Sequence, residues 1–513
     1  MDTLERYFTE INTSSEKRYE AKAVLVDMEV KVVHACKQTA AKTGAWNYSS
    51  SSLVRKKGSG NNWALGFHGY GHSVADDVID LCRKEAEKCD RFAGFFILMS
   101  LAGGTGSGLG AYVTQELRDA FPSSYLVNHV VWPYTSGEVI VQNYNIMLTM
   151  SRLQASSDLV IAQRNDHLHQ ICAKRLGFKK ISLQHVNSVI AHKLASILQP
   201  ATEEYRSVNT LSGIVTALGT HPAYKLASVK CIPHISDQAM SYSVFVWPAL
   251  LKHMKQMLIA DSPMEDGINW EIREPQQSST ASASDVFESH TQDGEIRRSS
   301  FNKSIANLMI LRGKELHEAD TNSFSNPRLY SEGSPIYTEW QQPRSFNQYQ
   351  KSITLLSNSQ TFVQPLTKSV TKAWEMFNSK AYLHQYEKYG LGVDDFIDSF
   401  GVKHNDARMW KLLTLACLFL LFCSPNVQCR SKKKQKQKNL SEKEVKDNEV
   451  QKVSSSKVPN GGRKGPTSGN LAGNLHISPV SIPFPVPKKV KGKKGKKVKE
   501  RNRESATSRQ QKK

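Results

Sequence analysis

The residues best suited to chemistry form a glycine-rich stretch at positions 103–108, which reads GGTGSG. Glycine lets a backbone approach an anion closely and adopt positive φ, and the first amides of a helix carry a partial positive charge. Thr105 and Ser107 add hydroxyl groups to the same stretch. The composition and spacing therefore predict a loop that binds phosphate.

Two elements must position this loop. The apolar run 95–101 precedes it and predicts a strand, and apolar residues near helical spacing between 109 and 120 follow it. The lysine of a GxxxxGKS or GxxxxGKT loop is missing, and the dinucleotide-binding pattern fits only loosely through Gly106, Gly108 and Ala111. The glycines alone therefore leave a tight turn without a ligand as an alternative.

The longer string AGGTGSGLG, on the predicted junction of strand and helix, closely resembles the tubulin signature GGGTGSG, with Ala102 at its first glycine. Four more strings are similar to tubulin segments: VLVDMEV at 24–30, GNNWALG at 60–66, NDHLHQIC at 165–172 and FNSKAYLHQY at 377–386. This resemblance covers about three quarters of the chain. It implies GTP as the ligand, with Mg²⁺ on its phosphates.

Glu29 follows a predicted buried strand at 21–28, and the carboxyl ends of strands in an open α/β sheet are where ligands bind. A solvated loop charge would explain the same position. Asn61 is likewise either a phosphate donor or a common turn former. The resemblance favours Mg²⁺ coordination by Glu29, directly or through water, and contact of Asn61 with the terminal phosphate.

Asn165 opens a predicted helix, where asparagine is usually an N-cap. The resemblance implies instead that Asn165 recognises guanine, because an amide offers both a donor and an acceptor. Asn187 matches a second base-contacting asparagine, and Leu183 stands where most tubulins stack an aromatic ring on the base. Glu138 or Gln142 would accept a hydrogen bond from a ribose hydroxyl, although QNYN replaces the usual EPYN.

These assignments give one metal ligand, Glu29, and no catalytic residue. The predicted nucleotide-binding residues are Ser100, Gly103, Gly104, Thr105, Gly106, Ser107, Gly108, Asn61, Glu138, Asn165 and Asn187. The carboxylate with which a tubulin hydrolyses its neighbour's GTP falls on Gly213 when counted back from the matching segment 220–222. The sequence thus predicts GTP binding and leaves GTPase activity open.

The predicted fold class is α/β: a tubulin-like doubly wound GTP-binding domain, a second α+β domain, a C-terminal helical hairpin and a disordered basic tail. The expected segments are 1–200, 201–354, 355–409, a short hydrophobic segment 410–429, and the tail 430–513. In the second domain we expect strands at 224–232, 241–247 and 305–311. The hairpin helices are expected at 355–378 and 381–400.

The first strand and helix of tubulins, with their GQCGNQ-type loop, find no match in this sequence. In a doubly wound sheet that strand lies in the middle of the strand order, so its two neighbours are expected to have exposed edges. We therefore expect an amino-terminally truncated chain with weakened nucleotide binding, because unpaired buried amides are costly.

The chain of 513 residues has a formal net charge of +21, almost all of it at its end. Residues 430–513 hold 25 lysines and arginines against six acidic residues. Such a tail could bind acidic tubulin tails, RNA, anionic lipid or an import receptor, or be a solvated extension. Without interleaved aromatic residues it does not predict sequence-specific nucleic-acid recognition.

Other sequence features argue against a zinc-binding, disulfide-rich, secreted or membrane-spanning protein. The eight cysteines form no CxxC pair, which predicts reduced thiols in the cytosol rather than a zinc site or a disulfide framework. The first residues lack the apolar core of a signal peptide. Residues 410–423 hold about a dozen apolar side chains, too few for a transmembrane span, and predict a core or interfacial helix.

The strings NNWALG, GSGLGAYVTQ and VIVQNYN are most similar to the delta branch of the tubulins. This resemblance implies a structural and regulatory protein of centrioles and basal bodies that supports cilium assembly, with other tubulins and centriolar proteins as partners. It implies a cytoplasmic and cytoskeletal location and leaves the nucleus open. The alternatives are a basic-tail adaptor and a nicotinamide-dependent oxidoreductase, which is disfavoured because the next strand ends in Val131-Trp132-Pro133 without an acidic ribose ligand.

Overall fold

The computed structural model describes residues 3–12, 17–55, 57–137, 139–201, 211–219, 221–274, 287–290, 296–299, 301–331 and 336–401. The expectations placed on Glu138, on the hydrophobic segment 410–429 and on the basic tail 430–513 therefore lie outside the described residues. Most of the serine-rich stretch 276–300 lies outside them as well.

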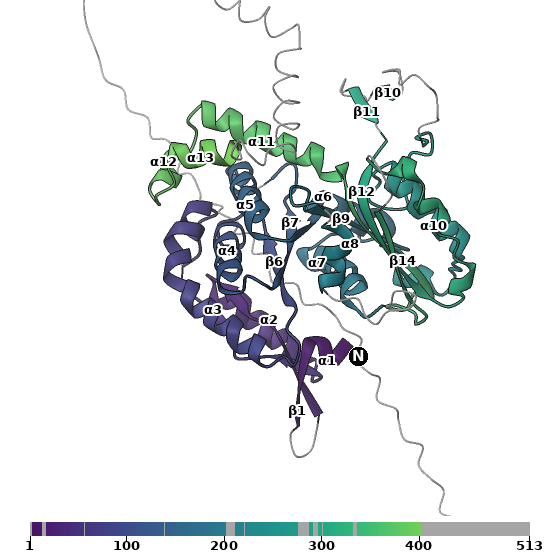
Figure 1. Ribbon diagram of the computed structural model, residues 1–513, viewed down its shortest axis with the longest axis horizontal. Coiled ribbons are helices and arrows are strands. Elements are labelled where there is room, and N and C mark those ends of the chain that lie inside the picture. The colour runs from purple at the N-terminus through teal and green to yellow at the C-terminus, as the bar shows by residue number, and fades with distance from the viewer. Residues whose placement is uncertain are drawn as a thin grey trace, which may run out of the picture. The chain divides into compact units, whose positions relative to one another are not determined.

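A seven-stranded sheet of order β13-β12-β14-β9-β8-β7-β6 forms the centre of the described chain (Figure 1). Its strands are β6 (Gly94–Ser100), β7 (Tyr125–Trp132), β8 (Leu159–Arg164), β9 (Leu226–Ile232), β12 (Ser304–Gly313), β13 (Ile336–Gln342) and β14 (Lys351–Ser359). Strands β6 to β9 are parallel to one another, whereas β14 is antiparallel to both β9 and β12. A parallel half and a mixed half thus share one sheet.

Helices cover both faces of this sheet. The main ones are α2 (Val30–Lys42), α3 (His72–Glu87), α4 (Gly110–Ala120), α5 (Gln142–Ser156), α6 (Asn165–Gln170), α7 (Leu183–Leu198), α8 (Leu211–Leu218), α10 (Trp247–Ile259), α11 (Val363–Asn378), α12 (Leu383–Glu387) and α13 (Val393–Phe400). Val127 and Val131 of β7 pack with α7 and α8, whereas Val130 and Trp132 pack with α5 and α11.

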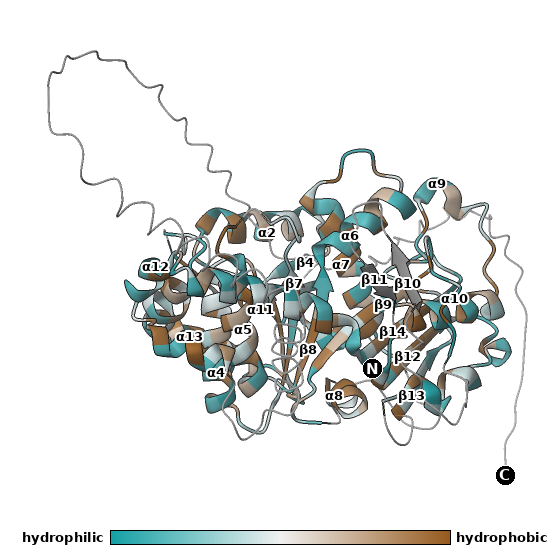
Figure 2. Cartoon of the chain, turned by 90° about the horizontal axis from the view of Figure 1, so that it is seen from above, coloured by the Kyte–Doolittle hydropathy of each residue, from teal (hydrophilic) through white to brown (hydrophobic). Residues whose placement is uncertain are grey.

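This burial on both faces explains the nearly continuous apolar runs of the parallel strands. Figure 2 shows the same division, with brown apolar residues along the strands and blue-green polar residues on much of the outer helix surface. A parallel-dominated sheet between helix layers confirms the predicted α/β fold class.

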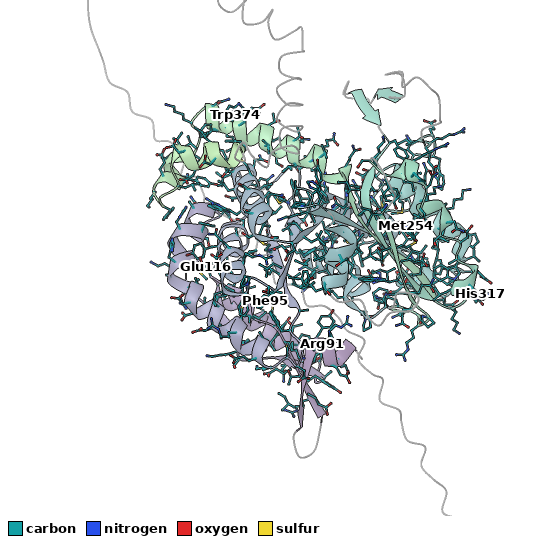
Figure 3. All side chains as sticks on the ribbon, in the orientation of Figure 1. Arg91, Phe95, Glu116, Met254, His317 and Trp374 are labelled. Carbon is teal, nitrogen blue, oxygen red and sulfur yellow. The ribbon has the colours of Figure 1, made fainter. Side chains whose placement is uncertain are left out.

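Strand β6 is an edge of the seven-stranded sheet. It pairs only with β7 among the described strands, while β3 (Leu25–Asp27) and β5 (Ser52–Val54) form a separate parallel pair. Leu98 of β6 is 41% exposed, although the sequence GFFILMS is typical of a central strand. Phe95, labelled in Figure 3, marks this strand. The open edge of β6 and the separate β3-β5 pair are what we expect if the first strand of tubulins, which would lie between β3 and β6, has no counterpart among the described residues.

The expectation of a strand at 241–247 is wrong. The short helix α9 (Asp237–Met240) is followed by an irregular segment, and α10 begins at Trp247. Pro248 occupies the first turn of α10, a position that proline favours because it lacks an amide hydrogen. The alternating apolar residues are exposed rather than paired, with Tyr242 at 88% and Val244 at 87% exposure.

The predicted C-terminal helices have different bounds. The segment from Leu355 to Ser359 belongs to β14, which is buried between β9 and β12, so α11 begins only at Val363. The second predicted helix is divided into α12 and α13, because Gly390 adopts a φ of +86° and Gly392 precedes the first turn of α13. The predicted hairpin is therefore one long helix followed by two short ones.

Five of the eight cysteines lie within the described residues. None of these five, Cys36, Cys82, Cys89, Cys172 and Cys231, forms a disulfide there. Burial raises the pKa of Cys36 to about 11 and that of Cys82 to about 12, so both stay protonated at neutral pH. Across the described ranges, no helix combines the length and apolar character needed to cross a membrane.

Candidate nucleotide-binding site

The glycine stretch follows β6 and opens a helix, as the sequence predicts. Thr105–Leu109 forms a π-helical turn that continues into α4. The Gly108 amide donates to the carbonyl oxygen of Gly104 at 2.8 Å and starts the helical bonding. The amides of Thr105, Gly106 and Ser107 precede this bond, at the end of the helix where a phosphate is stabilised.

Three of the four glycines in 103–108, namely Gly104, Gly106 and Gly108, are needed for close packing. None of them adopts positive φ, so the conformational role expected for them is wrong. A Cβ on Gly104 would lie 2.4 Å from the carbonyl oxygen of Asn62, and one on Gly106 would lie 2.9 Å from the backbone nitrogen of Ser100. Both distances are too short for any side chain, so these glycines hold the loop against its neighbours.

The turn at residues 58–62 forms a second wall of the site. The hydroxyl oxygen of Ser59 lies 2.7 Å from that of Thr105. Asn61 adopts a φ of +55°, and its Oδ1 lies 3.5 Å from the position that a Cβ on Gly103 would occupy. The structure therefore brings the predicted phosphate ligand Asn61 beside the predicted phosphate loop.

Asn145, a residue that the sequence reasoning missed, connects these loops. It is fully buried on α5, and its Nδ2 donates to the carbonyl oxygens of Asn61 at 2.8 Å and Ala102 at 2.7 Å. Its Oδ1 accepts from the Trp63 amide at 3.3 Å and from the Tyr386 hydroxyl at 2.7 Å. One amide thus holds the turn, the glycine loop and α12 together.

Glu29 lies between β3 and α2, close to the same turn. Its Oε1 is 3.0 Å from the position that a Cβ on Gly58 would take, so the carboxylate faces the turn. Asp27 accepts a hydrogen bond from the Glu29 amide at 3.0 Å and adds a second carboxylate. No group of three or more metal-ligating side chains occurs among the described residues. Mg²⁺ fits this donor set, because it commonly binds one or two carboxylates together with waters and phosphates.

The predicted base-contacting residues follow β8 and begin α7. Arg164, not Asn165, occupies the N-cap position of α6, so an N-cap role for Asn165 is wrong. Asn187 lies in the first half of α7, and α6 packs against α7 through Leu168 and Val186. Within the described residues neither asparagine amide makes a hydrogen bond, which leaves both available to a ligand.

The strand register brings these groups to one edge of the sheet. Ser100 of β6 pairs with Val131 of β7, and Trp132 pairs with Arg164 of β8, so the three strands end at nearly the same level. Ser100, the loop after β7 and Asn165 therefore share the carboxyl edge, where ligands bind in open α/β sheets.

The loop after β7 is the predicted ribose contact. Asp166 accepts hydrogen bonds from both the amide of Thr135, at 3.1 Å, and its hydroxyl, at 2.7 Å. Glu138 lies outside the described residues. Gln142 donates to the carbonyl oxygen of Tyr134 at 3.2 Å, so its amide supports this loop.

The second half of the chain offers no acidic group at the expected catalytic position. Gly213 lies in α8, whose sequence LSGIVTAL has no acidic side chain. The described site consists of backbone amides, hydroxyls, asparagine amides and carboxylates. Groups of these types can bind and orient a nucleotide with its ion.

Comparison with known proteins supports this interpretation. Residues 2–173 match the model of the Tubulin/FtsZ family, GTPase domain. The chain is 46% identical over 392 residues to the tubulin delta chain of Mus musculus, covering 74% of this chain and 84% of that protein. It is 46% identical over 389 residues to the human tubulin delta chain, with the same coverage, and 45% identical over 405 residues to that of Canis lupus familiaris. With this identity and coverage, the chain belongs to the tubulin family.

Proposed function

We propose that this chain is a GTP-binding tubulin that acts as a structural and regulatory component of the microtubule cytoskeleton. The observation that carries GTP binding is the grouping of four features from distant parts of the sequence. The loop 103–108 and Asn165 follow the carboxyl ends of strands in one sheet, and the turn that bears Asn61 and faces Glu29 packs against that loop. These residues come from widely separated parts of the sequence, and the hydrogen bonds of Asn145 hold two of the loops in place.

In this proposal each part of the nucleotide has a partner. The amides of residues 105–107 and the side chain of Asn61 bind the phosphates, and Glu29 holds Mg²⁺ with Asp27 beside it. Asn165 and Asn187 recognise guanine, because an amide can match its donor and acceptor edge. Glu138 accepts a hydrogen bond from the ribose.

We further propose that the chain binds GTP without hydrolysing a neighbour's nucleotide efficiently. Gly213 occupies the position of the activating carboxylate, and losing a general base typically lowers a rate by about 10²–10⁴. The chain would then regulate assembly through its bound nucleotide and its contacts with other tubulins.

The cellular role rests on the similarity of the loops to delta tubulins. We place the protein at centrioles and basal bodies, in support of cilium assembly, with centriolar proteins and other tubulins as partners. The domain organisation we propose is a GTP-binding domain at 1–200, a second domain at 201–354, a C-terminal segment at 355–409 that begins with the end of β14, a short hydrophobic segment at 410–429 and a basic tail at 430–513.

Binding of fluorescent GTP and ATP analogues to the purified full chain tests this function. We expect GTP to bind at least about tenfold more tightly than ATP, because losing a buried base contact costs about 1.4 kcal/mol or more. Asn165→Ala should remove most of this preference, whereas Gln170→Ala, on an exposed position of α6, should keep it. Equal affinity for the two nucleotides in the unaltered chain would contradict the proposal.

The basic tail supports a second, weaker interaction. Its excess of lysine and arginine is suited to acidic tubulin tails. Deleting residues 430–513 should abolish salt-sensitive binding to microtubules and leave GTP affinity unchanged. Loss of GTP affinity in the deletion variant would show that the tail belongs to the nucleotide-binding unit instead.

A further inference from the structure

Strands β8 and β9 separate before they end. Their pairing runs only from Val160 and Leu226 to Ala162 and Ser228, so β8 continues beyond the last shared pair. A cavity of about 30 Å³ lies where the strands diverge. Its lining includes Gln163, Arg164, His167, Lys193, Lys230 and Thr361, which come from β8, α6, α7, β9 and the turn after β14.

The cationic side chains at this cavity outnumber their acidic partners. Lys230 donates to Asp261 at 2.9 Å, and a nitrogen of Arg164 lies 3.7 Å from an oxygen of Asp166. Lys193 is 4% exposed, and its ammonium makes one long hydrogen bond, 3.5 Å, to the carbonyl oxygen of Val229. No described carboxylate lies within 4.0 Å of the Lys193 ammonium, so this buried cation has no directly paired counterion there, and Glu265 acts on it only from a longer distance.

Two further polar atoms at the cavity have no hydrogen-bond partner among the described residues. They are the Nε of Arg164 and the Oε1 of Gln163. The Nε2 of Gln163 lies 3.0 Å from the Nε2 of His129. Rotating this amide by 180° lets its oxygen accept from His129 and its nitrogen donate into the cavity. Buried polar groups are costly when unpaired, so the cavity favours an occupant that accepts hydrogen bonds.

The positive charges around the cavity affect the protonation of His167. Its burial, reinforced by the charges of Arg164, Lys230 and Lys193, lowers the pKa of His167 to about 2. Burial also lowers the pKa of Lys193 to about 8. At neutral pH His167 is therefore neutral while Lys193 keeps its proton, and the cavity is positively charged.

We propose that this cavity binds a monatomic anion, chloride, between Lys193, Arg164 and Lys230. The ion would supply the missing counterion of Lys193 and accept hydrogen bonds from Arg164 and Gln163. The volume is about twice what a single water needs, which suits a monatomic anion such as chloride. Arg164, with a side chain 23% exposed, connects the site to solvent.

Crystals of the full chain soaked in sodium bromide test this site directly, because bromide replaces chloride and scatters anomalously. We expect an anomalous peak within hydrogen-bond distance of the Lys193 ammonium. Density at the level of water, without an anomalous signal, would overturn the proposal.

Thermal unfolding gives an independent test in solution. At constant ionic strength, replacing gluconate with chloride should raise the melting temperature of the unaltered chain. Lys193→Met should raise the half-saturating chloride concentration by at least about tenfold, because it removes a charge-assisted contact. Lys84→Met, on an exposed position of α3, should respond to chloride as the unaltered chain does.

The two variants separate a specific site from a general salt effect. Equal responses to chloride in the unaltered chain and in Lys193→Met would overturn the proposal. If Lys193→Met does not fold, the bromide experiment on the unaltered chain decides the question alone.

Discussion

The side-chain amide of Asn145 donates to the carbonyl oxygen of Asn61 at 2.8 Å, across 84 residues of sequence. The same nitrogen donates to Ala102, immediately before the glycine loop. A buried side chain on α5 therefore fixes the distance between two segments that must both contact phosphate. Positioning of this kind is how a rigid element makes a loop into a binding site.

Asn145→Ala should weaken both folding and nucleotide binding. It leaves several buried polar groups without partners, so we expect the free energy of unfolding to fall by about 3 kcal/mol. Denaturant unfolding and retention of bound nucleotide on gel filtration measure the two effects. Asn143→Ala, on the half-buried neighbouring position, should change neither, and an unaffected Asn145→Ala variant would show that the connection is dispensable.

Alanine substitutions at the adjacent residues Gly103 and Gly104 should have different effects on GTP affinity. A Cβ on Gly104 would meet the Asn62 carbonyl oxygen at 2.4 Å, whereas one on Gly103 would have its nearest contact at 3.5 Å. We expect Gly104→Ala to lower GTP affinity at least about tenfold, because the loop must shift, and Gly103→Ala to change it little. Titration with a fluorescent GTP analogue measures this. The reverse order would mean that packing against the turn 58–62 does not shape the loop.

The nucleotide site shows which features can be predicted from the local sequence and which cannot. The phosphate loop, the strand β6 before it and the helix α4 after it are all predictable, because apolar periodicity and glycine content are local properties of the sequence. Asn145 was missed because its four partners come from other parts of the chain, and nothing local distinguishes it from Asn143.

Contacts with distant parts of the chain also explain why some secondary-structure predictions were wrong. Leu355 fits a helix by spacing, but β9 and β12 pair with it from both sides. Residues 241–247 alternate like a strand but pair with none of the described strands, and the last of them, Trp247, begins α10 instead. The prediction that the loop glycines adopt positive φ was also wrong because of a contact with a distant segment. Gly104 is required by its packing against Asn62, not by its backbone conformation.

Acid should destabilise the fold below pH 6.5 through His129. Burial lowers its pKa to about 3, whereas an unfolded histidine titrates near 6.5. The unfolded state therefore binds more protons in this window. The contribution of neutral His129 is fully present above pH 6.5 and is lost as the pH falls toward 3, by up to about 1.4 kcal/mol per pH unit.

Unfolding measurements between pH 7 and 5 on His129→Gln check this effect. The variant should show a smaller loss of stability with falling pH than the unaltered chain. His34→Gln, on an exposed position of α2, provides the matched control. Identical pH profiles for His129→Gln and the unaltered chain would contradict the assignment.

The open edge of β6 should promote self-association. An exposed apolar edge strand can pair with another chain, and Leu98 is 41% exposed. Leu98→Lys should therefore reduce light scattering at high protein concentration without lowering GTP affinity. Leu126→Lys, at a fully buried position of β7, should unfold the protein. Unchanged scattering in a folded Leu98→Lys variant would show that this edge is not the site of association.

The most direct test of GTP binding is the identity of the nucleotide that the purified full chain carries. The protein is first shown to be folded by circular dichroism, then denatured, and the released nucleotide is identified by chromatography. The grouping of the phosphate loop, Asn61 and Asn165 predicts that the bound nucleotide is a guanine nucleotide. Because the open edge of β6 is expected to weaken the site, we expect less than one copy per chain after purification and further binding when GTP and Mg²⁺ are added. A folded chain that releases no nucleotide, and binds none when GTP and Mg²⁺ are added, would contradict it.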